Sequence, residues 1–174
     1  MLSSTQSNLS YAAQLYLWKK RTLYIGKFEA PIELSQGAAT LTISLDEPFT
    51  FITNDMESPI QTHSLILPAG CAVTLDTQNA LVANCNLDAL GRDYFTLFSY
   101  ARMKQQTIGY ELSQEKLLID CFDHLFKHEL NSLEACDYLE NKLSPIELSK
   151  DQYPIDSRIE KAIELIQSRV NDNM

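Results

Sequence analysis

Side chains that could hold a metal ion gather on one predicted helix. His124 and His128 are one helical turn apart and Asp120 stands one turn before them, so a helix places all three on one face. A metalloprotease helix needs a glutamate directly after the first histidine, and Leu125 stands there instead. We interpret this face as a solvated helix surface and predict no metal site on it.

The motifs of nucleophilic catalysis and of phosphate binding do not occur in the sequence. There is no GxSxG segment, no cysteine with a recognisable histidine partner and no glycine-rich phosphate loop. The adjacent carboxylates of Asp46 and Glu47 would point to opposite faces of a strand, and beside Pro48 they are typical of a loop. We therefore predict no catalytic residue and expect that the chain is not an enzyme.

Aromatic residues near the N-terminus could instead line a site for a small molecule. Four of them alternate with aliphatic residues along two predicted strands: Tyr16, Trp18, Tyr24 and Phe28. Aromatic side chains with a polar group often line apolar pockets, and ordinary core packing is the alternative for each of them. These four residues are our candidates for a ligand pocket.

The charge balance excludes two classes of partner. The 174 residues include 14 basic and 23 acidic side chains, which gives a formal net charge of −9. Nucleic acids and anionic membranes attract clustered basic residues, and the one basic run, Lys19 to Arg21, is short and fits a turn between two strands. No apolar run could span a bilayer, and no secretory signal is recognisable. We therefore predict a cytoplasmic protein that does not itself bind DNA or membranes.

The cysteines show no redox or zinc pattern. No two of them lie within ten residues of each other, so the sequence has no CxxC motif. The four are Cys71, Cys85, Cys121 and Cys136. We expect free thiols that pack as small hydrophobic residues in a reducing compartment.

The first half of the chain has the pattern of short strands. Residues 26–91 contain most of the glycines and prolines, which is typical of many strands joined by turns. Thr40 to Leu45 and Leu81 to Leu87 alternate apolar and polar residues, so Leu41 and Ile43 share one face of a strand and the hydroxyls share the other. Several such segments with no helix between them favour a closed or sandwiched antiparallel sheet.

Beyond about residue 110 the apolar residues recur with the period of a helix. The pattern predicts a helix from Ser113 to Leu130, and Asn131 with Glu134 forms a capping box at the start of a second helix. A third amphipathic helix begins near Asp156. Residues 92–106 fit either a buried strand or a short helix, and we favour the helix.

The apolar stripe of the third predicted helix has no later element to bury it. Four or five aliphatic side chains between Ile159 and Val170 would each lose about 1.5–3 kcal/mol by staying in water. We therefore expect this helix to fold back on the domain, to meet another copy, or to belong to a longer protein.

Two stretches of the chain resemble a known family. His63 to Asp76 (HSLILPAGCAVTLD) resembles a strand–turn–strand segment of the cupin-like sensor domain in AraC-family transcription regulators, and Leu81 to Asp88 resembles its next strand. Asp156 to Gln167 (DSRIEKAIELIQ) is similar to the helix that opens the DNA-binding half of that family. The resemblance implies an α+β fold, in which an N-terminal antiparallel cupin-like β-barrel precedes a helical pair and a C-terminal amphipathic helix.

The same resemblance implies three units with different roles. Residues 1–110 would form an effector-sensing barrel, residues 111–148 a dimerising helical pair, and residues 149–174 a linker with the first helix of an absent DNA-binding domain. The expected partners are a small-molecule effector, which the four aromatic residues would hold, and a second copy of the chain. DNA would be bound only through the absent C-terminal domain.

The expected dimer interface is the apolar stripe of the first predicted helix, which is wider than one sheet face needs. Its residues are Leu117, Leu118, Cys121, Phe122 and Leu125. Two alternatives to the regulator remain open, a stand-alone cupin that binds a small molecule and a metal-dependent cupin enzyme.

A cupin metal site would need several ligands that converge from different strands. His63 precedes a strand, but Val73 stands where related sensor domains often carry histidine, and the other two histidines lie in the helical half. We therefore expect no metal and no other cofactor.

Overall fold

The computed structural model describes residues 13–88, 92–128 and 130–143, which form eleven strands and three helices. The strands are β1 (Gln14–Leu17), β2 (Thr22–Lys27), β3 (Ile32–Ser35), β4 (Thr40–Ser44), β5 (Phe49–Ile52), β6 (Ile60–Thr62), β7 (Ser64–Leu67), β8 (Ala72–Asp76), β9 (Leu81–Asn86), β10 (Ala101–Gln105) and β11 (Ile108–Leu112). The helices are α1 (Asp93–Ser99), α2 (Glu115–His128) and α3 (Ser132–Leu143).

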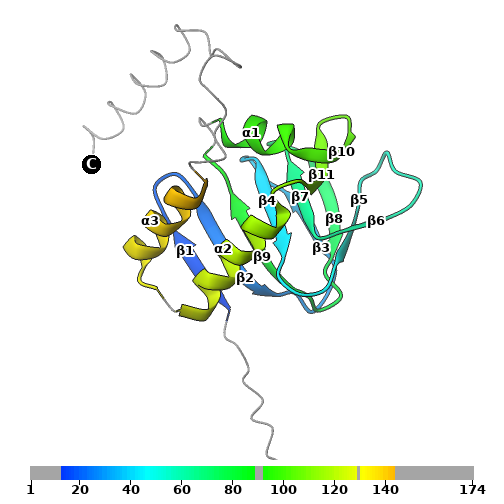
Figure 1. The fold of residues 1–174 in the computed structure, drawn as a ribbon. Coiled ribbons are helices and arrows are strands. Elements are labelled where there is room, and N and C mark those ends of the chain that lie inside the picture. The colour runs from blue at the N-terminus through cyan, green and yellow to red at the C-terminus, as the bar shows by residue number, and fades with distance from the viewer. Residues whose placement is uncertain (1–12, 89–91, 129, 144–174) are drawn as a thin grey trace, which may run out of the picture.

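The strands form two facing antiparallel sheets. The larger sheet has the order β1-β2-β9-β4-β7-β11-β10 and the smaller has the order β3-β8-β5-β6 (Figure 1). Of strands β2 to β9, the larger sheet thus contains β2, β9, β4 and β7, and the smaller sheet contains β3, β8, β5 and β6. This is the jelly-roll arrangement of two Greek keys, which cupins share. The predicted fold class, α+β with a cupin-like antiparallel barrel before a helical pair, is confirmed. The predicted C-terminal helix lies outside the described residues.

The helical half follows the predicted pattern closely. Helix α2 occupies most of the segment expected to be helical, and α3 begins at the capping box. The side-chain oxygen of Asn131 accepts hydrogen bonds from the backbone N–H groups of Leu133 and Glu134, and the Glu134 carboxylate accepts one from the Asn131 N–H. The ambiguous residues 92–106 contain both α1 and β10. The favoured helix is therefore present in the first part of the segment, and the alternative strand is present in the second.

The central strands of the larger sheet, β9, β4 and β7, are covered on both sides. Helices α2 and α3 lie across one side, and the smaller sheet faces the other (Figure 1). Leu41 and Ile43 of β4 belong to the core beneath the helices, whereas Thr42 stands opposite Leu65 of β7, which belongs to the core between the sheets. The predicted alternation is confirmed, and the hydroxyl side of β4 is the side inside the jelly roll.

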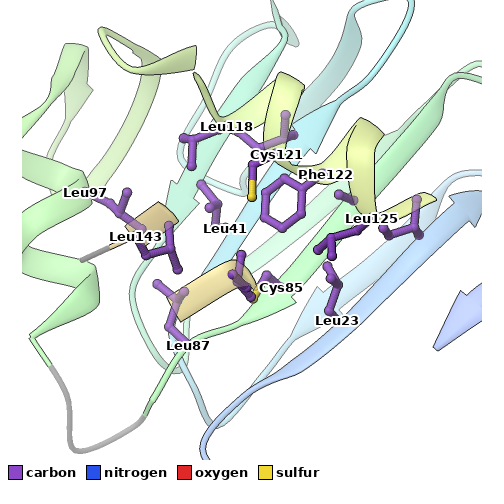
Figure 2. Packing of buried hydrophobic residues seen from close by; sticks show 14 of the residues in the cluster. Leu23, Leu41, Cys85, Leu87, Leu97, Leu118, Cys121, Phe122, Leu125 and Leu143 are labelled. Carbon is purple, nitrogen blue, oxygen red and sulfur yellow. The ribbon is translucent and has the colours of Figure 1, made fainter. Parts of the chain in front are cut away.

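The apolar stripe of α2 packs on the sheet. Four of the five residues assigned to a dimer interface are at most 2% exposed: Leu118, Cys121, Phe122 and Leu125. They point toward Leu23, Leu41 and Cys85 of the sheet, with Leu143 of α3 beside them (Figure 2). The assignment of these four residues to a dimer interface is therefore corrected. The stripe is wide because it packs on both the sheet and α3 of the same chain, and it is buried without a second copy. Leu117 is 40% exposed.

The core beneath the helices provides a test of this packing. Phe122 is fully buried, so Phe122→Ala should lower the free energy of unfolding by about 3–5 kcal/mol. Leu133→Ala is the control on α3, because Leu133 is 72% exposed, and it should change the free energy by less than about 0.5 kcal/mol. Urea unfolding followed by circular dichroism measures both. Equal effects of the two variants would contradict the packing described here.

Candidate functional site

Polar side chains from three neighbouring strands of the larger sheet point into the jelly roll. The register places Thr22, Asn86 and Thr40 in one row across β2, β9 and β4, and the next inward row contains Tyr24, Asn84 and Thr42. The residues between these rows, such as Leu23 and Cys85, belong to the core on the helix side. We call the six inward residues the polar face: Thr22, Tyr24, Thr40, Thr42, Asn84 and Asn86.

Hydrogen bonds connect the polar face from strand to strand. The side-chain N–H of Asn84 donates to Thr42 Oγ1 at 2.9 Å. The side-chain N–H of Asn86 donates to Thr22 Oγ1 at 3.0 Å, and the side-chain oxygen Oδ1 of Asn86 accepts from the Thr40 hydroxyl at 3.1 Å. Buried polar groups need such partners, and Thr40, Thr42 and Asn84 are all buried. Hydroxyls and amides have more donor and acceptor positions than these bonds use.

The surroundings of the polar face are uncharged. The Tyr24 and Phe28 rings are stacked with centroids 5.0 Å apart, and the half-buried Ile32 and Leu34 of β3 pack against the core between the sheets. The inward residues of β2, β9, β4 and β3 include no charged side chain. The inward sides of these four strands therefore offer neutral hydrogen bonds beside apolar contacts and supply no opposite charge to a charged ligand.

Two of the four predicted pocket residues lie on this inward side and two do not. Tyr24 and Phe28 are inward, as just described. Tyr16 stands opposite Leu23 and shares its helix-facing side, and its ring stacks on Trp18 at 5.3 Å. The indole N–H of Trp18 donates to the carbonyl of Ser132 in α3 at 2.7 Å. Tyr16 and Trp18 therefore do not line the barrel interior, because both are turned toward the helices. Trp18 lines a separate hollow of about 180 Å³ with Arg21 and Glu140, between the hairpin turn and α3.

The sequence reasoning missed the asparagines and threonines of the polar face. Their signal was present in the alternation of Thr40 to Leu45 and of Leu81 to Leu87. That alternation was read without deciding which side faces the barrel. In a sheet covered by helices on one side, the apolar set can face the helices and the polar set can face inward.

The basic run contains a buried ion-pair centre that the sequence did not reveal. Lys19 and Lys20 are exposed in the turn between β1 and β2, as predicted, but Arg21 is only 8% exposed. Its Nε donates to Asp93 of α1 at 2.9 Å, its Nη2 lies 2.7 Å from the same carboxylate, and its Nη1 pairs with Glu140 of α3. Burial acts to lower the pKa of Arg21, but the two carboxylates outweigh it and the pKa is raised.

The histidines do not come together at a metal site. The rings of His124 and His128 are stacked with centroids 3.9 Å apart, and Tyr138 stacks on His124 at 4.4 Å. His63 lies between β6 and β7, and its Nδ1 is buried with no hydrogen-bond partner among the described atoms. The described part of the chain contains no group of three histidine, cysteine, aspartate or glutamate side chains that could hold a metal ion.

A hollow of about 370 Å³ lies between α2 and α3 on the outer side of the helical pair. Leu117 and Tyr138 contribute to its lining, together with Lys116, Asp120 and Lys142. The exposed Leu117 is therefore at the edge of a groove that carries both apolar and charged groups. Among the helices of the described residues, none is long and apolar enough to cross a lipid bilayer.

The comparisons with known proteins concern the fold. No protein-family model matches the chain, and no curated protein matches it. Similar solved structures include a protein from Neisseria meningitidis (7% identity, TM-score 0.39, 45% of this chain and 85% of that one). Another is a cupin superfamily protein from Desulfitobacterium hafniense, with 12% identity and a TM-score of 0.38 over 44% of this chain and 76% of that one. A third is a cupin domain from Bordetella pertussis, with 9% identity and a TM-score of 0.38 over 45% of this chain and 93% of that one. At these values the likeness carries no argument about chemistry, and the fold class rests on the strand order.

The four cysteines are free, and two of them are buried next to the helices. Burial raises the pKa of the Cys85 and Cys121 thiols from the ordinary value of 9.0 to about 12. Both thiols therefore stay protonated and unreactive in the folded protein near neutral pH.

This burial predicts a loss of stability at high pH. Between pH 9 and pH 12 the unfolded chain releases two protons that the folded chain keeps, so the free energy of unfolding falls as the pH rises, by up to about 1.4 kcal/mol per pH unit for each thiol. The double variant Cys85→Ala/Cys121→Ala should show a flatter dependence in urea unfolding, and Cys71→Ala/Cys136→Ala should keep the steep one. Identical slopes in both double variants would show that the buried thiols do not titrate in this way.

Proposed function

We propose that the chain is the effector-sensing unit of an AraC-type transcription regulator, and that it binds a small uncharged polar effector on the polar face. The observation that carries the proposal is the hydrogen-bonded, uncharged polar face inside the jelly roll. The resemblance of His63 to Asp76 and of Asp156 to Gln167 to that family supports the same role. The order of a barrel followed by a helical pair agrees with it.

The chemistry of the polar face selects the class of effector. Hydroxyl and amide groups exchange hydrogen bonds with a ligand that carries hydroxyls or amides of its own, and Tyr24 with Phe28 offers aromatic contact beside them. A charged ligand would lose its hydration without meeting an opposite charge, which is costly in a buried site. The proposed effector is therefore a neutral polyhydroxylated or amide-bearing molecule.

Binding becomes a signal only if the effector prefers one arrangement of the domain over another. The proposed signal is a change in how the helical pair is held on the barrel, because the pair covers the opposite side of the sheet that carries the polar face. We propose that the chain itself carries out no reaction.

Asn84→Leu tests this binding face directly. Leucine has a similar volume but no amide, so it removes the bond to Thr42 and any bond to an effector. Neutral sugars, polyols and amides, each paired with an acidic analogue, would be screened by thermal shift and titrated by calorimetry. We expect a neutral compound to bind the native chain, and Asn84→Leu to weaken that binding about 10-fold or more.

The control for this variant is Thr74→Val on β8. Thr74 alternates with the buried Val73 and Leu75, so it lies on the outer side of the smaller sheet. This variant should bind as the native chain does. A compound that binds Asn84→Leu with native affinity, or an acidic analogue that binds better than its neutral counterpart, would contradict the proposal.

Two further measurements separate this role from its alternatives. Elemental analysis of the purified protein for bound transition metals would favour a metal-dependent cupin enzyme if it found one metal per chain. The reading frame of the gene separates the regulator from a stand-alone binding protein, because a regulator requires two helix-turn-helix units after the helix that the sequence predicts near Asp156.

We also propose that the chain forms a homodimer through the outer side of the helical pair. Four of the five residues predicted for the interface are buried in the chain's own core. The fifth, Leu117, is exposed beside the α2–α3 groove and can contact a second copy. Light scattering should give twice the 19.8 kDa chain mass. Leu117→Asp should shift the mass to that of a monomer, and Met103→Asp on β10, which is similarly exposed (46% against 40%), should leave it unchanged. A native monomer at high concentration would contradict the dimer.

A further inference from the structure

The β1–β2 hairpin presents different side chains to the two sides of the larger sheet. The side chains that point toward the helices are Gln14 and Tyr16 of β1 and, on either side of the turn, Trp18 and Arg21. Thr22 and Tyr24 of the second strand belong to the polar face on the opposite side. The hairpin lies beneath α3 at the end of the larger sheet (Figure 1).

The turn region of this hairpin holds α3 near both of its ends. Trp18 donates its indole N–H to the carbonyl of Ser132, the first residue of α3. Arg21 pairs with Glu140 in the last part of the same helix, and its other nitrogens bind Asp93 of α1. Two side chains only three residues apart in sequence therefore link the hairpin to both ends of α3, which also packs on the core through Ala135, Leu139 and Leu143.

The same strand is tied to the polar face at the next residue. Thr22 follows Arg21 directly, and its hydroxyl accepts the hydrogen bond from Asn86 of β9. Thr22 and Arg21 are adjacent in sequence, and their side chains point to opposite faces of the sheet. The same short piece of backbone therefore carries a polar-face residue on one side and the α3 contact on the other. A change in the spacing of Thr22 and Asn86 would therefore act on the backbone that carries Arg21.

The ion pairs of Arg21 reach both α1 and α3. The Arg21 guanidinium and the Asp93 carboxylate of α1 are poorly exposed, at 8% and 12% of their side-chain surface, whereas Glu140 of α3 is 51% exposed. The pair with Asp93 is costly to separate and fixes Arg21, and the pair with Glu140 adds a weaker link from Arg21 to α3 beside the hydrogen bond of Trp18. Arg21 is in this sense a positioning residue for α3.

We propose that the β1–β2 hairpin couples the hydrogen bonds of the polar face to the position of α3, with Trp18 and Arg21 as its two tethers. The use of this coupling as the route of an effector signal rests on the proposed function. The coupling itself requires no ligand and can be measured in the protein alone.

Amide hydrogen exchange of the full chain tests the coupling, with the α3 peptide covering residues 132–143 as the reporter. Thr22→Val removes one polar-face bond on the hairpin, and Thr42→Val removes one on the central strand β4 without changing the hairpin. We expect Thr22→Val to accelerate exchange in α3 about two- to ten-fold, the range for one lost hydrogen bond, and Thr42→Val to leave α3 unchanged. Equal acceleration in both variants would overturn the proposal, because it would report a general loss of stability.

The tethers are tested from the helix side. Glu140→Gln and Trp18→Phe each remove one tether and should accelerate α3 exchange, whereas Asp137→Asn changes the same charge on the same helix without touching the hairpin and should not. In the double variant Trp18→Phe/Glu140→Gln, adding Thr22→Val should have no further effect on α3. A further acceleration there would overturn the proposed route.

Exchange is preferable to thiol labelling of Cys136 as the readout. Burial, and then the carboxylates of Glu140 and Asp137, raise the pKa of the Cys136 thiol, so the charge variants would change its reactivity directly.

The exchange result also separates the coupling from the proposed function. If no effector binds but Thr22→Val and Thr42→Val still differ, the coupling stands and the proposed function fails.

Discussion

Burial of the central strands of the larger sheet on both sides is the constraint that organises this molecule. On the helix side, Leu23, Leu41 and Phe122 are removed from water, which favours folding through apolar area. On the inward side, threonines and asparagines are buried, and they are tolerated because they bond to one another across the strands. The same strands therefore supply stability on one side and binding groups on the other.

Much of the fold could be predicted from the sequence because its signals are local. The alternation in β4 and the capping box of α3 each depend on residues within a few positions of one another, and both are present as expected. The side of the sheet that faces inward could not be predicted, because the alternation is the same whichever side is turned to the helices.

The contacts that decide the site depend on distant residues. Arg21 looks like one member of a solvated basic run until it meets Asp93 and Glu140, which are 72 and 119 positions further along the chain. The α2 stripe similarly looks too wide for one sheet face until α3 packs beside it. Both errors arise from treating an element without its long-range neighbours.

A fold of this kind serves many functions, so the proposed role depends on the chemistry of the polar face and not on the jelly roll. The polar face and the helical pair occupy opposite sides of one sheet, and the β1–β2 hairpin contacts both of them. This layout gives binding inside the barrel a short physical path to the elements outside it.

The most direct test of the polar face as a binding site is a side-chain amide NMR titration with a neutral compound that stabilises the protein. A ligand on the polar face should shift the side-chain amide signals of Asn84 and Asn86 most strongly as the compound is added. Shifts confined to Gln114, at the groove between α2 and α3, would place the ligand there and contradict binding on the polar face.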